Sequence, residues 1–131
     1  MDAALTSEAF RWGVDLFNFG YYWEAHEAWE GLWQTSREAP GQRTFLHALI
    51  LLCAAGVKLR EGKDVPALRH ARRAAGLLRA LRYQRDFTAA IGMPPEELAD
   101  RAEADALAGA RLHASVSPIP RAAFAFTIVP D

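Results

Sequence analysis

The residues best suited to chemistry lie in one short segment of the sequence. His26 and Glu30 are four positions apart, and Trp33 follows three positions later. On a helix this spacing brings the three side chains to one side. An imidazole nitrogen and a carboxylate oxygen directed at one point are two ligands for a divalent metal ion such as zinc, manganese or iron. A stable site takes three or four ligands, so further donors are needed.

Other polar and aromatic residues are candidates to complete this site. A third metal ligand, or a polar partner for the pair, is sought among His47, Glu27, Asn18 and Asp15. The wall of the pocket is predicted to consist of Tyr22, Trp29 and Trp33. If the protein is an enzyme, metal-dependent hydrolysis needs the fewest assumptions, because a bound metal ion activates water.

A second interpretation of the same pair is structural. An unpaired buried polar group costs about 1–3 kcal/mol, so His26 and Glu30 can satisfy each other and fix the register of neighbouring helices. The protein would then be a non-catalytic interaction or scaffold module, with outer aromatic residues or a C-terminal arm making the contacts. The substitution His26→Ala separates the two interpretations. It should cost several kcal/mol if the pair is buried scaffolding, whereas the fold should survive if the pair is a ligand site.

The elements that position these residues are predicted to be two consecutive helices. Phe10, Val14 and Phe17 recur at helical spacing, and Gly20 ends the first helix. The second helix covers residues 21–34, and the short connection predicts an antiparallel hairpin. One side of the second helix is predicted to be buried, through Tyr22, Ala25, Trp29, Leu32 and Trp33.

Three further helices are predicted after a loop at residues 37–41. Residues 42–61 are apolar on nearly every side, which is typical of the central helix of a bundle. A fourth helix starts at Asp64, and its buried stripe is predicted to contain Val65, Leu68, Ala71, Ala75 and Leu78. A fifth helix covers residues 96–112. The predicted fold class is all-α, a compact bundle of four to five helices around a central apolar helix, with an extended C-terminal arm.

The predicted arm begins where the helical pattern stops. Residues 115–120 contain two prolines and cannot form a regular helix. Phe124, Phe126 and Ile128 then alternate with smaller residues, as in a strand. A single strand has no ladder partner in an all-α domain. The arm therefore either lies over the bundle or pairs with the same segment of a second subunit.

The composition limits the classes of protein to which this chain can belong. The chain has 131 residues, of which 51% are hydrophobic and 24% charged, as in one globular domain. Its net charge of -1 gives no bulk attraction to nucleic acid or to an anionic membrane, although a local patch can act on its own.

The longest apolar stretch, residues 48–55, is far shorter than the roughly 20 residues of a membrane span. The one cysteine, Cys53, is predicted to be an inert core residue, and the expected location is the reducing cytoplasm.

Two surface patches suggest further partners. Arg69, Arg72 and Arg73 share one side of the fourth helix and suit phosphates or an acidic partner. The simpler interpretation is a solvated surface that the acidic fifth helix screens. Tyr21 and Trp23 lie off the buried stripe and predict an exposed apolar patch, hence a homodimer interface. Otherwise the partner is an unknown small molecule or protein.

The segment around His26 is also similar to a known family. Residues 17–33 read FNFGYYWEAHEAWEGLW. They resemble the bacterial and archaeal domain of unknown function 309 family, whose hallmark is a His, three residues, a Glu, two residues and then Trp or Tyr. The hallmark falls on His26, Glu30 and Trp33. The resemblance implies a small helical bundle and a suggested role in metal binding, but no known reaction.

Weaker similarity to the family continues along the third and fourth helices. The family often has a Gln-rich turn where this chain has His47 and Leu51, so His47 is a candidate replacement donor or ligand. Residues beyond about Phe87 look like an extension outside the shared domain. We therefore divide the chain into a family-like bundle at residues 1–90 and a C-terminal helix and arm at residues 91–131, packed on the same single domain.

Overall fold

The computed structural model describes residues 3–111 and 122–131, and it confirms the all-α class. A short 3-10 helix (η1, Ala3–Thr6) precedes six α-helices. Their bounds are α1 Glu8–Asn18, α2 Tyr22–Gln34, α3 Pro40–Arg60, α4 Asp64–Ala80, α5 Arg85–Ile91 and α6 Pro95–Arg111. The described residues contain no strand, and residues 122–131 form an extended arm.

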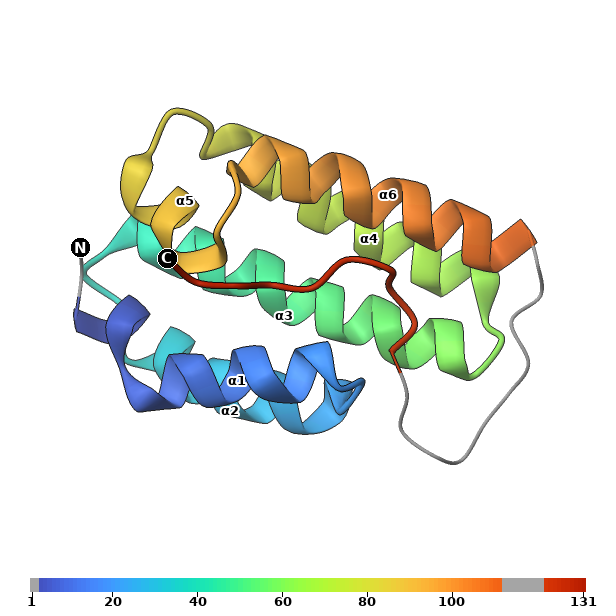
Figure 1. Ribbon diagram of the computed structural model, residues 1–131, viewed down its shortest axis with the longest axis horizontal. Coiled ribbons are helices and arrows are strands. Elements are labelled where there is room, and N and C mark those ends of the chain that lie inside the picture. The colour runs from blue at the N-terminus through green and yellow to red at the C-terminus, as the bar shows by residue number, and fades with distance from the viewer. Residues whose placement is uncertain (1–2, 112–121) are drawn as a thin grey trace.

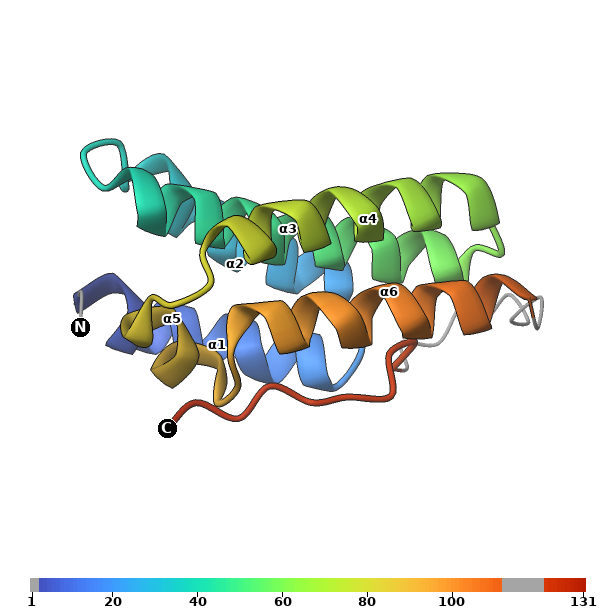
Figure 2. The same cartoon turned by 90° about the horizontal axis from the view of Figure 1, so that it is seen from above.

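The helices are arranged in two layers. Seen from above, α2, α3 and α4 lie side by side in one layer, while α1 and α6 lie in the other (Figure 2). The central helix is α3, which packs against both α2 and α4 as predicted. By length and composition α3 could cross a membrane, but 61% of its apolar window is buried inside the bundle. That burial is the pattern of a core helix.

The ends of the helices follow from local residue chemistry. Ser7 caps α1, because its hydroxyl oxygen accepts a hydrogen bond of 3.2 Å from the backbone N–H of Phe10. Gly20 has a φ of 86°, the left-handed conformation expected at the turn of the hairpin. The predicted loop at residues 37–41 is shorter than expected, since α3 already begins at Pro40. Proline is tolerated there because the first turn of a helix has no intrahelical partner for its N–H.

Two features of the C-terminal half differ from the prediction. Residues 85–91 form the additional short helix α5, which ends at Gly92 with a φ of 73°. In α4, Val65 is exposed, and the buried stripe is formed mainly by Ala67, Ala71, Ala74 and Ala75. Small side chains let α3 and α6 approach α4 closely on two sides, so alanine rather than valine faces the core here.

The arm packs on the two helices of the second layer, α1 and α6. Figure 1 shows it running across α3 between α1 and α6. Phe124, Phe126 and Ile128 are buried, while the residues between them are exposed. The rings of Phe124 and Phe126 stack on Phe17 of α1, with centroids 5.8 Å and 6.0 Å away. The arm thus lies over the bundle, the first of the two predicted alternatives. Residues 112–121, and with them the predicted segment 115–120, lie outside the described residues.

Side chains of the bundle replace the missing strand partner of the arm. The Asn18 amide donates to the backbone oxygen of Ile128 and accepts from its N–H, both at 2.8 Å. The Tyr22 hydroxyl accepts from the N–H groups of Ala123 and Phe124, at 2.7 Å and 3.4 Å. Asp105 of α6 accepts from Ala125 at 2.8 Å. An extended segment with buried backbone groups requires such partners.

Candidate functional site

The α1–α2 hairpin that carries the candidate residues is held by Trp29. This indole is fully buried, and its Nε1–H donates to the backbone oxygen of Phe10 at 3.1 Å. Gly13 of α1 lies directly against the ring, and an added Cβ would lie 2.6 Å from the indole Cδ1. The close approach fixes the rotation of α2 about its axis, and therefore the direction in which the hallmark residues point.

His26 and Glu30 contact each other on a partly exposed surface of α2. The Nδ1 atom of His26 lies 3.3 Å from Oε2 of Glu30, a contact that becomes an ion pair when the imidazole is protonated. Their side chains are 27% and 42% exposed. The Nδ1 atom is itself shielded from solvent and forms no hydrogen bond of good geometry. The imidazole ring also stacks on Trp23, at 5.6 Å and an interplanar angle of 3°.

A small cavity adjoins His26 between α2 and α3. Its volume is about 140 Å³, and Trp23, His26, Ala54, Val57, Lys58 and Cys53 line it. Cys53 is buried, and burial raises the pKa of its thiol well above the usual value. A thiol held in its neutral form is a poor nucleophile and a poor metal ligand, in line with the predicted inert core residue.

The third hallmark residue, Trp33, belongs to a different cluster. The guanidinium carbon of Arg43 lies 3.8 Å from the centre of the Trp33 ring, and its Nη1 donates to the Trp33 backbone oxygen at 3.2 Å. His47 lies on the same ring, with centroids 6.1 Å apart. Burial lowers the pKa of His47, and the positive charges of Arg73 and Arg43 lower it further.

The other predicted site residues do not converge on His26. Tyr22 and Trp29, the predicted pocket wall, are fully buried core residues and do not line the cavity beside it. Asn18 binds the backbone of the arm. Glu27 and Asp15 are exposed. The pairing of Asn18 with Ile128 had no local signal in the sequence, because the two residues are 110 positions apart.

The part of the chain that the structure describes therefore supplies no ligand set for a metal ion. Among residues 3–111 and 122–131, no three His, Cys, Asp or Glu side chains are grouped as metal ligands would be. His26 and Glu30 alone provide two donors, fewer than the three or four that structural or catalytic metal sites use.

The exposure of the pair predicts a small effect on stability. We expect His26→Ala to lower the free energy of unfolding by about 1 kcal/mol or less, because a partly solvated ion pair contributes little. Urea denaturation of wild type, His26→Ala and Glu30→Gln measures this effect. A loss of several kcal/mol in either variant would instead identify the pair as buried scaffolding.

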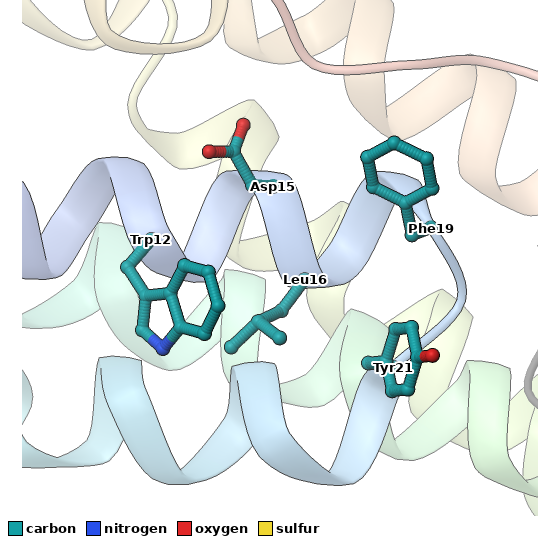
Figure 3. Close-up of a pocket in the computed structure, with 5 residues that line it drawn as sticks. All are labelled: Trp12, Asp15, Leu16, Phe19 and Tyr21. Carbon is teal, nitrogen blue, oxygen red and sulfur yellow. The ribbon is translucent and has the colours of Figure 1, made fainter.

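A second candidate site lies on the outer side of the same hairpin. Trp12, Phe19 and Tyr21 are 59%, 72% and 42% exposed. Together with Leu16 and Asp15 they line a shallow hollow of about 380 Å³, shown in Figure 3. We call these five residues the aromatic surface. The predicted exposure of Tyr21 agrees with the structure, whereas Phe19 was not singled out, because it lies outside the helical repeat at the end of α1.

Asp15 is the one charged residue of the aromatic surface. In Figure 3 its carboxylate points away from Trp12 and Leu16, so the apolar side chains form a patch with the charge at its edge. Contiguous exposed apolar patches are uncommon on monomeric proteins and mark interaction sites. Aromatic residues in particular are enriched at the centres of protein interfaces.

Comparison with known proteins identifies one family. The model of the family described as Domain of unknown function (DUF309) matches residues 10–70, from α1 into α4. The match includes the hallmark residues and also Asn18 and Tyr22, but neither α6 nor the arm. No match to the chain was found among the curated proteins or among the solved structures. Residues 10–70 of this helical chain thus belong to the domain of unknown function 309 family.

Proposed function

We propose that this protein is a non-catalytic interaction module that forms a homodimer through the aromatic surface. The observation that carries the proposal is the exposure of three large aromatic side chains, Trp12, Phe19 and Tyr21, around one hollow. Fully burying one such side chain contributes about 1.5–3 kcal/mol. The free energy of association is therefore most favourable with a partner that buries all three rings together.

Charge complementarity favours a second copy as that partner. In a two-fold interface the same surface meets itself, so opposite charges must be placed symmetrically. Arg11 and Asp15 are four residues apart on α1, are exposed, and form no ion pair within the described residues. If two α1 helices cross antiparallel at the level of residue 13, Arg11 of each copy lies opposite Asp15 of the other. The net charge of -1 adds little repulsion.

Analytical ultracentrifugation tests the proposal. At about 100 µM protein we expect wild type to sediment at twice the chain mass of 14.5 kDa. Trp12→Ser combined with Phe19→Ser should give monomer at that concentration, with an unchanged melting temperature because both residues are exposed. The matched control is Val65→Ser, which removes an exposed apolar side chain from α4.

A charge exchange tests the geometry of the interface. Arg11→Asp or Asp15→Arg alone should weaken the dimer, since each places like charges opposite each other. The double variant Arg11→Asp/Asp15→Arg should restore it. A monomeric wild type at 100 µM would overturn the proposal, and so would a dimer that survives the loss of Trp12 and Phe19.

A further inference from the structure

A basic surface lies on a different part of the molecule, on the layer formed by α2, α3 and α4. We call it the basic face, and its residues are Arg43, His47 and Lys58 of α3 with Arg69, His70 and Arg73 of α4. Burial lowers the pKa of His70, as do the charges of Lys58, Arg69 and Arg73. Arg73 acts in the same way on His47. The positive charge of Arg73 thus acts on both histidines, so Arg73 lies between His47 and His70 on the basic face.

Most of these cations form no ion pair with an acidic side chain of residues 3–111 or 122–131. Within the described residues, Arg69 and Arg73 form no ion pair, whereas Arg79 of the same helix pairs with Asp100 and Glu103 of α6 at 2.8 Å and 2.6 Å. Asp100 and Glu103 also line one hollow with Arg72, so the predicted screening by the acidic helix reaches both Arg79 and Arg72. Lys58 pairs with Glu61 at 3.2 Å. Like charges held together without acids raise the free energy of the surface and favour a bound anion.

The cations are spread along the helices instead of converging on one point. Arg43 and Lys58 are 15 residues apart on α3, so they are separated by about 22 Å at 1.5 Å per residue. A single phosphate cannot reach both ends of such a row. A polymer with regularly spaced phosphates can follow it.

An exposed aromatic ring, that of Trp23, lies beside the Lys58 end of this row of cations. Trp23 of α2 is largely exposed and stacks on His26, and both residues share the 140 Å³ cavity with Lys58. Cations that follow a backbone, next to an aromatic ring on which a base stacks, are the parts of a single-strand binding surface. In a duplex the bases stack on one another, so none of them has a free face to stack on the Trp23 ring.

We propose that the basic face and Trp23 bind single-stranded nucleic acid, with phosphates on Arg43, Arg69 and Arg73 and a base stacked on Trp23. His26 holds the Trp23 ring from one side, which gives the hallmark histidine a positioning role in this complex. The near-neutral net charge predicts no bulk attraction, so binding depends on this local field and weakens steeply with salt.

Fluorescence anisotropy with a labelled 15-nucleotide oligothymidine and the full chain tests this proposal. We expect binding at 50 mM salt and a loss of affinity of at least tenfold for Arg69→Gln/Arg73→Gln. The slope of log affinity against log salt should become shallower by about 1.4, because each lost phosphate contact contributes about 0.7. The control Arg85→Gln/Arg101→Gln removes the same charge from α5 and α6 and should leave affinity and slope unchanged.

The aromatic contact is tested separately. Trp23→Ala should weaken binding about tenfold without changing the salt slope, since it removes stacking and no charge. The exposed side chains make an unchanged melting temperature the expected sign of an intact fold. Trp12→Ser/Phe19→Ser should bind as wild type does, so this proposal and the homodimer succeed or fail independently.

Three results would overturn the inference. The first is no binding of the oligonucleotide by wild type at 50 mM salt. The second is an equal loss of affinity in the control variant. The third is equally tight binding of a 15-base-pair duplex or of vesicles with phosphatidylserine, which would identify a general attraction to anionic surfaces.

Discussion

Replacing Phe124 and Phe126 together by alanine is expected to lower the free energy of unfolding by about 5 kcal/mol or more. A buried Phe→Ala change alone typically costs about 3–5 kcal/mol. Both rings stack on Phe17, and the two are 5.2 Å apart, so the single effects will not simply add. A loss of this size is a large part of the stability of an ordinary domain.

Urea denaturation followed by circular dichroism measures this change. The matched control is Thr127→Ala, an exposed position of the same arm, which should change stability by less than about 0.5 kcal/mol. A double variant within about 1 kcal/mol of wild type would show that the arm does not form part of the core.

The second large effect is expected from a single methyl group. Gly13→Ala should destabilise the protein by about 2 kcal/mol or more, because the new Cβ overlaps the Trp29 indole. The ring cannot retreat, since it is fully buried and hydrogen-bonded to Phe10. This cost exceeds the roughly 1 kcal/mol that alanine gains over glycine within a helix.

Gly76→Ala is the matched control, because nothing lies within 4 Å of its added Cβ. There the same substitution should raise stability by about 0.5–1 kcal/mol. Adding Trp29→Phe to Gly13→Ala should recover part of the loss, because a smaller ring frees space for the methyl group. Equal effects at Gly13 and Gly76 would contradict the predicted overlap.

The periodic parts of the fold were predictable from the sequence. Helical spacing identified Tyr22, Ala25 and Trp29 as the buried side of α2, and all three are fully buried. The even distribution of apolar residues in α3 predicted its central position. These patterns are local, so each is visible without knowledge of the tertiary structure.

The parts that depend on distant contacts were not predictable. Val65 looked like a core residue, yet alanine forms the buried stripe of α4 because two helices pack closely against it. The short helix α5 has only seven residues, too few for a periodic signal. Asn18 resembled a site residue, and only the folded chain shows its amide paired with Ile128.

In the candidate site, too, local spacing was predictable from the sequence and the distant contacts were not. Spacing alone placed His26 and Glu30 in contact, since residues four apart on a helix are neighbours. Which residues surround the pair depends on how α2 is rotated against α3. The contact of Trp29 with Gly13 and its hydrogen bond to Phe10 fix this rotation. The sequence therefore indicated the pair but not the cavity that it shares with Trp23 and Lys58.

The position of the arm also affects how the protein folds during its synthesis on the ribosome. Asn18 and Tyr22 are synthesised early, but the backbone groups that they bind follow 110 and 101 residues later. Until those residues emerge, Phe17 and Tyr22 lack their cover, and the helices already made expose an aromatic strip. Such exposure during synthesis favours aggregation. Folding is therefore completed only after residue 128 has left the ribosome, and chaperones have their main opportunity to bind before that moment.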